Sequence, residues 1–167
     1  MLKSLRQKWM PIFLVLTLLA ALIVPLAPVS VSEASESATE DIIIEDVRIK
    51  MRDGVELAAR VYRPNDDGKY PVLLSRTPYN SGAFNAPKGT AGDYVNIGTS
   101  YTKMGYAVVV QDVRGRYASD GVPEPFKGDD TDGYDTLEWI AEQNWSNQKI
   151  GMFGASARGM TQTSMMD

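Results

Sequence analysis

The hydrophobic and polar positions of the chain first predict two extended segments. Residues 42–51 (IIIEDVRIKM) pass from an apolar run into alternation, and residues 55–62 (VELAARVY) alternate again. Alternation with period two is typical of a strand that buries one face. Between the two segments stands Asp53-Gly54, a strong signal for a hairpin turn. We therefore expect an antiparallel hairpin at the start of the folded region.

Beyond the hairpin, short apolar runs alternate with segments of helical spacing. The expected elements are strands over 70–75, 106–111 and 149–153, helices over 94–104, 131–143 and from 160 onward, and turns over 64–68, 145–148 and 154–159. Strands that alternate with helices are typical of a parallel sheet covered by helices. The order predicts an α/β fold, with the antiparallel hairpin at one edge of the sheet and parallel strands inside it.

The N-terminal segment has the pattern of a secretory signal peptide. A basic start precedes the apolar run 12–24 (IFLVLTLLAALIV), which is shorter than the ~20 residues of a membrane-spanning helix. Small residues place the predicted cleavage after Ala34, with Ala38 as a competing position. The predicted division is a signal peptide over 1–34, a flexible leader over 35–41 and a partial α/β domain over 42–167. An exported protein (secreted, periplasmic or on the cell surface) is expected, and an uncleaved membrane anchor is the alternative.

Composition narrows the chemistry that these residues can perform. The 167 residues contain no Cys and no His, and 17 basic residues stand against 21 acidic ones, for a net charge of −4. Disulfides, a cysteine nucleophile, a His-ligated metal and a complete Ser-His-Asp triad are thereby excluded within them. Because Lys and Arg form no cluster, nucleic acid is not an expected partner. The sequence indicates no cofactor.

The turn over 154–159 (GASARG) carries the strongest chemical signal. A Gly-flanked turn between a strand and a helix is the setting of a nucleophile elbow, in which a strained backbone lifts a serine hydroxyl above the sheet edge. The usual pattern is G-x-S-x-G, whereas here Arg158 occupies the fifth position and Gly159 follows. Two alternatives stay open on the motif alone. In the first, Ser156 would be a structural residue of a Gly-rich turn. In the second, it would replace the second glycine of a dinucleotide-binding G-x-G-x-x-G fingerprint.

Several further segments occur in a recognisable order and spacing. They are 51–58 (MRDGVELA), 61–64 (VYRP), 71–79 (PVLLSRTPY), 105–116 (GYAVVVQDVRGR), 118–121 (ASDG), 135–139 (DTLEW) and 149–156 (KIGMFGAS). Over residues 45–164 the chain resembles the α/β-hydrolase group that contains X-prolyl dipeptidyl peptidases, cocaine-esterase-like enzymes and α-amino-acid ester hydrolases. The resemblance implies the N-terminal part of an α/β-hydrolase fold, with Ser156 on the elbow.

The resemblance also implies a serine acyl hydrolase that acts on a small acyl ester or peptide. Ser156 matches the nucleophile, and the backbone N–H of Ala157 and the hydroxyl of Tyr79 match the two donors of the oxyanion hole. A phenolic hydroxyl suits that role because it can donate to a developing oxyanion. The family usually has Tyr after the nucleophile. Ala157 keeps the backbone donor but changes the neighbouring pocket.

The catalytic acid and histidine of this family lie far downstream of the elbow, and neither is among these residues. We therefore expect an N-terminal fragment, truncated after the elbow, with negligible hydrolase activity by itself. The family's parts that select between an ester and an X-Pro peptide are also absent. An exported non-catalytic product or binding module is the competing hypothesis.

Four aspartates gather before and within the predicted helix over 131–143: Asp129, Asp130, Asp132 and Asp135. A calcium loop would read D-x-D-x-[DN]-G, but Tyr134 occupies its third ligand position. We expect the aspartates instead to cap the helix and to pair with its dipole. Arg114 and Arg116 are expected to hold the loop that follows the strand over 106–111, with substrate contact as the alternative.

Overall fold

The computed structural model describes residues 41–84 and 94–166, which form one mixed sheet with three helices. The strands are β1 (Ile42–Lys50), β2 (Glu56–Pro64), β3 (Tyr70–Thr77), β4 (Ala107–Asp112) and β5 (Ser146–Met152), in the spatial order β1-β2-β4-β3-β5. The pairs β1–β2 and β2–β4 are antiparallel, whereas β4–β3 and β3–β5 are parallel. The predicted α/β sheet with an antiparallel edge is confirmed.

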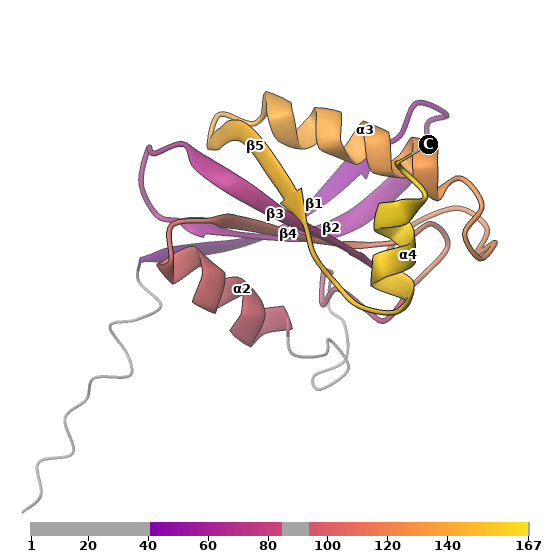
Figure 1. The fold of residues 1–167 in the computed structure, drawn as a ribbon, viewed down its shortest axis with the longest axis horizontal. Coiled ribbons are helices and arrows are strands. Elements are labelled where there is room, and N and C mark those ends of the chain that lie inside the picture. Colours follow the sequence, from indigo (N-terminus) through magenta and orange to yellow (C-terminus); the bar gives the residue numbers. More distant parts are fainter. Residues whose placement is uncertain (1–40, 85–93, 167) are drawn as a thin grey trace, which may run out of the picture. The chain divides into compact units, whose positions relative to one another are not determined.

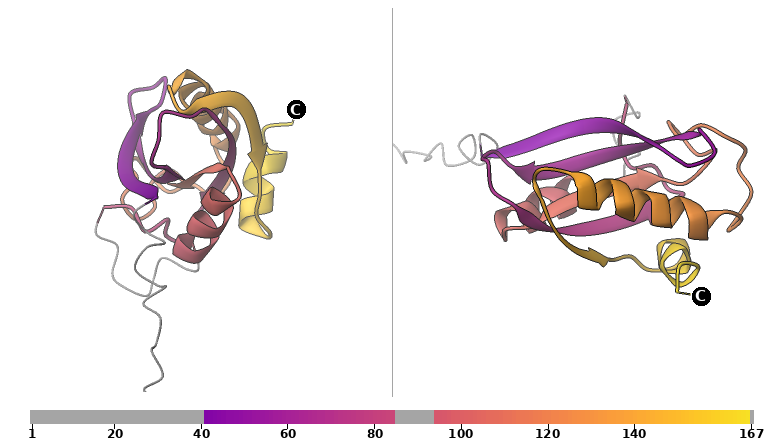
Figure 2. Two further views of the ribbon diagram at one scale, coloured as in Figure 1. Left: turned by 90° about the vertical axis from the view of Figure 1, so that its left-hand side faces the viewer. Right: turned by 90° about the horizontal axis from the view of Figure 1, so that it is seen from above.

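The helices cover both faces of this sheet. Helix α3 (Asp129–Glu142) lies along one face and α2 (Tyr94–Lys103) along the other, as Figure 1 and the two turned views of Figure 2 show. The short helix α4 (Ala157–Thr163) follows β5 at the edge of the sheet where the parallel strands end. Among the described residues, no helix has the length and apolar character that crossing a bilayer requires.

Buried side chains form one hydrophobic cluster on each face of the sheet, beneath the helices that cover it. Every residue of β4 is buried, and its side chains alternate between the two faces. Ala107 and Val109 join the cluster that includes Ile140 of α3, while Val108 and Val110 join Tyr94 of α2. Because β4 is covered on both faces, its first four residues form a continuous apolar run rather than an alternation.

Two predicted starts are wrong by three residues, whereas the other predicted boundaries of strands and helices differ from the structure by at most two. Strand β5 begins at Ser146, three residues before the expected start, since Ser146 already pairs with Tyr70 of β3. The side chains of Ser146 and Asn147 accept hydrogen bonds from the amides of Gln148 and Lys149, as turn residues do, and the sequence therefore resembles a turn. These residues form an irregularity in a strand and not a separate turn. Helix α4 begins at 157 rather than 160. The predicted signal peptide and residues 35–40 of the predicted leader lie outside the described residues.

Candidate functional site

The parallel strands β3, β4 and β5 end at one edge of the sheet, and three loops leave it there. Strand β3 continues into residues 78–84, β4 into residues 113–128, and β5 into residues 153–156. In α/β sheets, ligands bind at this carboxyl edge because the loops of neighbouring parallel strands converge on it. The register pairs Thr77 with Asp112, so the first two loops start side by side.

Ser156 occupies a strained backbone position at the junction of β5 and α4. Its φ is 59° and its ψ is −132°, in a region that residues with a Cβ rarely adopt, and strain of this kind gathers at functional sites. Gly154 has a φ of 140°, and a Cβ there would collide with the Cβ of Arg158. The Ser156 side chain is exposed and makes no capping hydrogen bond to α4. Among residues 41–84 and 94–166, no hydrogen-bond partner is found for this hydroxyl, which lies at the junction of β5 and α4.

Ala157 follows directly as the first residue of α4. The carbonyl of Ser156 accepts hydrogen bonds from the N–H groups of Gly159 (2.8 Å) and Met160 (3.1 Å), which closes the first turn. The first N–H groups of a helix have no acceptor within it. Within residues 41–84 and 94–166, no acceptor is found for the N–H of Ala157. A backbone donor is therefore available beside the Ser156 hydroxyl.

Tyr79 lies in the loop after β3, two residues beyond the strand end. Its side chain is 49% exposed, whereas the next residues, Asn80 and Ser81, are 1% and 0% exposed. The backbone N–H of Tyr79 donates to Oγ1 of Thr77 (3.0 Å), and the hydroxyl of Tyr94 donates to the same oxygen (2.9 Å). An exposed phenol thus projects from a buried, hydrogen-bonded backbone.

Arg158 connects the elbow to the Tyr79 loop. Its guanidinium lies 5.6 Å from the centroid of the Tyr94 ring and donates to the Tyr94 hydroxyl (3.4 Å). Through Tyr94 and Thr77 this contact reaches the N–H of Tyr79. Sequence reasoning did not predict the connection. The only signal was that Arg158 stands where the elbow pattern has Gly.

A cavity of about 280 Å³ lies beside the elbow at the carboxyl edge. Pro78, next to Tyr79, and Ala157, next to Ser156, line this cavity, whereas Tyr79 and Ser156 themselves are not among its lining residues. The rest of its wall comes from the loop after β4 and from Asp129 and Thr161, with the loop residues Val113, Arg114, Arg116, Pro123, Glu124, Pro125, Phe126 and Lys127. The wall combines apolar side chains with charged groups of both signs.

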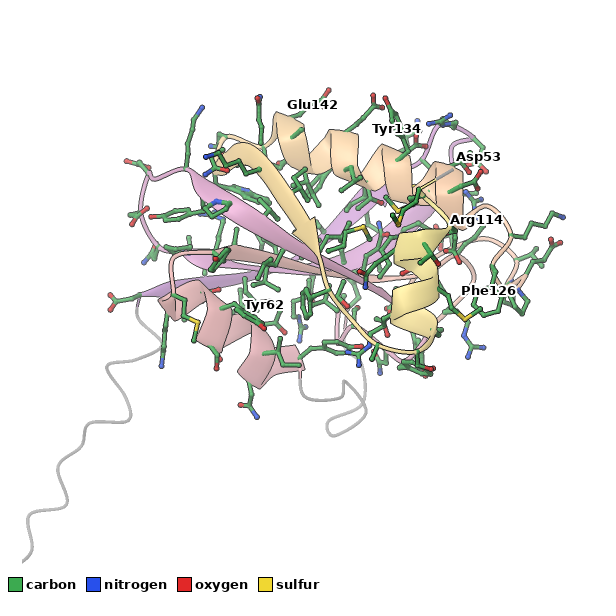
Figure 3. All side chains as sticks on the ribbon, viewed as in Figure 1. Asp53, Tyr62, Arg114, Phe126, Tyr134 and Glu142 are labelled. Atoms are coloured by element: carbon green, nitrogen blue, oxygen red, sulfur yellow. The ribbon has the colours of Figure 1, made fainter. Side chains whose placement is uncertain are left out.

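The acidic cluster of α3 is engaged by arginines. Arg76 lies 3.2 Å from Asp129 and 3.8 Å from Asp132, and Arg114 lies 2.6 Å from Asp132. Arg114 also pairs with Asp53 at 2.8 Å, and Figure 3 shows both at this end of the sheet. Strong hydrogen bonds to these carboxylates raise the pKa of the Arg114 guanidinium. The described part of the chain contains no group of three side chains placed to hold a metal ion.

The expected aspartate cap of α3 is wrong. The N-cap is Gly128, with a φ of 75°, and no side chain caps the helix. Three aspartates do lie in the first turn, where the helix dipole favours negative charge. Arg114 holds the loop after β4 to carboxylates, as expected. Among the described residues Arg116 forms no ion pair, and its guanidinium lies 6.0 Å from the centroid of the Tyr117 ring.

Comparison with known proteins gives concordant matches. The model of the X-Pro dipeptidyl-peptidase family (S15 family) matches residues 53–167. A cocaine esterase of Rhodococcus sp. is 43% identical over 120 residues, which are 72% of this chain and 20% of that protein. A CocE/NonD family hydrolase from Staphylococcus aureus superposes with a TM-score of 0.63 at 31% identity, over 74% of this chain and 25% of the other.

An α-amino acid ester hydrolase superposes with a TM-score of 0.61 at 31% identity, over 84% of this chain and 26% of the other. The sheet and helices therefore correspond to the N-terminal portion of α/β-hydrolase structures, as predicted. The chain spans about a fifth to a quarter of the length of the relatives it matches.

Proposed function

The chain belongs to the X-Pro dipeptidyl-peptidase S15 family, and on that basis we propose that it carries the nucleophile and the oxyanion donors of a serine acyl hydrolase. The observation that carries the proposal is the backbone of Ser156. A φ of 59° directly before α4 presents, at the carboxyl edge of the sheet, a hydroxyl that caps no N–H group of this helix. A merely structural serine at a helix start would use that hydroxyl as a cap.

The proposed reaction proceeds through an acyl-enzyme. The Oγ of Ser156 attacks the acyl carbonyl while a general base takes its proton. The carbonyl oxygen becomes an oxyanion, to which the N–H of Ala157 and the hydroxyl of Tyr79 donate. Collapse of this intermediate breaks the bond to the leaving group, which receives the proton from the base. Water then releases the acyl group by the same two steps.

The base must come from outside these residues. Histidine has this role in the serine triad, and the 167 residues contain none. The proposed substrate is a carboxylic ester rather than an X-Pro peptide. The 43%-identical relative is named an esterase, and one of the similar structures is named an ester hydrolase.

A chimera tests the proposal directly. The matching 120 residues of this chain replace their counterpart in the Rhodococcus cocaine esterase, which supplies the remainder of the protein; we call this protein the esterase chimera. We expect it to hydrolyse a p-nitrophenyl ester and to react with a fluorophosphonate probe, and the 167-residue chain alone to show neither. A folded chimera without turnover or labelling would reject the proposal and favour the non-catalytic binding module.

We also propose that the protein is exported, because the apolar run of the N-terminal segment has the length of a signal peptide. The expected result of expression with the complete N-terminus is a protein recovered outside the cytoplasm whose intact mass corresponds to a start at Ser35, or at Thr39 if the competing site is used. A matched variant with Leu18→Arg in the apolar run should remain unprocessed. Recovery of the wild-type chain with residues 1–34 still attached would reject cleavage and favour the membrane anchor.

A further inference from the structure

Asp112 is the last residue of β4 and is completely buried. It lies level with Thr77, the last residue of β3, in the parallel register of the two strands. Its carboxylate therefore sits where the loop that carries Tyr79 and the loop after β4 leave the sheet. The sequence placed it within the segment 105–116, which contributes to the family resemblance, but indicated no chemical role for it.

The carboxylate of Asp112 connects these two loops. The backbone N–H of Ser81 donates to Oδ1 (2.6 Å), and the hydroxyl of Ser81 donates to Oδ2 (2.9 Å). The backbone N–H of Ala118 also donates to the carboxylate. Oδ1 thus accepts from the backbone of Ser81 and Oδ2 from its side chain, so the end of β4 holds a residue that lies 31 positions earlier in the chain.

These donors are all neutral, and no ion pair formed by residues 41–84 and 94–166 includes Asp112. Burial raises the pKa of the Asp112 carboxyl to about 6, although the hydrogen bonds from Ser81 and Ala118 oppose that shift. A buried charge without a cation is costly unless its hydrogen bonds are satisfied. The carboxylate therefore acts here as an acceptor for loop backbone and not as half of an ion pair.

The Tyr79 loop is held on both sides of Tyr79. On one side Thr77 accepts the N–H of Tyr79. On the other side Asp112 accepts the N–H and the hydroxyl of Ser81, and the Ser81 hydroxyl in turn accepts the N–H of Ala83 (3.2 Å). With the backbone fixed two residues beyond Tyr79, the half-exposed phenol retains only its side-chain rotations.

We propose that Asp112 is a positioning residue for Tyr79: its buried carboxylate, through Ser81, fixes the backbone from which the Tyr79 hydroxyl reaches a developing oxyanion. That Asp112 fixes the Tyr79 loop follows from the hydrogen bonds alone. That this serves catalysis rests on the proposed function. Catalysis requires such donors to be in place before the charge develops, so a fixed backbone is what the role of Tyr79 demands. Asp112 itself touches no reacting atom.

The test follows Tyr79 by ¹⁹F NMR in the 167-residue chain with 3-fluorotyrosine at position 79. The chain contains no histidine, so no imidazole titrates in the range of interest. As the pH falls through about 6, the Asp112 carboxyl gains a proton, and an oxygen that accepted a hydrogen bond becomes a donor that faces other donors. We expect the ¹⁹F signal to change with a midpoint near pH 6.

Variants decide whether Asp112 is the source of that change. Asp112→Asn keeps the shape of the side chain but presents an amide N–H₂ to one of the Ser81 donors, so the midpoint should vanish and exchange of the Ser81 amide should accelerate roughly 10- to 100-fold. Ser81→Ala removes one of the two bonds, and the midpoint should persist with a smaller amplitude. Asp130→Asn, at an exposed aspartate, should reproduce the wild-type titration.

A Tyr79 signal that does not titrate near pH 6, or one that still titrates in a folded Asp112→Asn chain, would overturn the inference. So would an unchanged Ser81 exchange rate in that variant. If Asp112→Asn does not fold, Ser81→Ala decides alone, and an amplitude equal to the wild type rejects the role. None of these readouts requires turnover, so an inactive esterase chimera would reject the proposed function and leave this result standing.

Discussion

Replacing Ser156 with alanine in the esterase chimera is expected to lower ester turnover by about 10⁴- to 10⁶-fold and to abolish fluorophosphonate labelling. Alanine retains the backbone and the Ala157 donor but removes the attacking oxygen. The stability of the protein should be unchanged, because the Ser156 hydroxyl caps no N–H of α4. Alanine also has a Cβ, so it neither relieves nor adds to the strain at a φ of 59°.

Lost activity together with unchanged stability would distinguish a catalytic nucleophile at Ser156 from a serine that only stabilises the fold. A serine that serves the fold at a helix start typically loses ~1 kcal/mol when it becomes alanine. Ser164→Ala is the matched control. It removes a hydroxyl that bonds the Thr161 carbonyl (3.1 Å) at the other end of α4, so turnover should stay at the wild-type level. Undiminished labelling of Ser156→Ala would contradict the nucleophile assignment.

Tyr79→Phe in the esterase chimera should lower ester turnover by less than Ser156→Ala does. It removes one of the two proposed oxyanion donors and leaves the nucleophile, so turnover should fall by about 10²- to 10³-fold, less than for Ser156→Ala. Phe retains the half-exposed ring, and the N–H of residue 79 still donates to Thr77. A loss of turnover together with a loss of stability would point instead to a packing role for this ring.

The sequence pattern was sufficient for the element types and insufficient for their order in space. The alternation in β1 and β2 and the apolar runs of β3 and β4 led to correct strands, because each pattern records which faces are covered. Nothing local to a strand records that β4 lies between β2 and β3. The polar start of β5 failed as a strand signal, since Ser146 and Asn147 satisfy neighbouring amides by themselves.

The candidate site likewise contains some residues that the sequence predicts and others that only the structure shows. Ser156 could be proposed from the contiguous turn over 154–159, and Ala157 and Tyr79 from the resemblance to the family, whose segments are each contiguous in the chain. Asp112 and the contact of Arg158 with Tyr94 could not, because each joins residues at least thirty positions apart and depends on which loops converge at the sheet edge. Arg76 belongs to the same class: a buried arginine in an apolar strand is understood only once α3 has been placed over its end.

Arg76→Met is expected to destabilise the chain by about 3–5 kcal/mol, the effect of removing one partner from a buried ionic network. Arg76 is completely buried, and burial lowers the pKa of its guanidinium against the attraction of Asp129 and Asp132. Its Nε donates to Gln111 (2.8 Å) and its Nη1 to the carbonyl of Asp129 (2.7 Å). Methionine fills similar space but leaves these acceptors, and the Asp129 carboxylate, without their donor.

Urea unfolding of the 167-residue chain measures this effect against Arg48→Met. Arg48 pairs with Asp120 at 3.3 Å, but both side chains are exposed, so its loss should cost only about 0–1 kcal/mol. Adding Asp129→Asn to Arg76→Met removes the uncompensated charge and should restore part of the stability, because the penalty comes mainly from the charge that is left behind. Equal destabilisation by Arg76→Met and Arg48→Met would show that Arg76 does not organise the start of α3. In that case the cavity wall that Asp129 contributes beside the elbow would be held by packing rather than by charge.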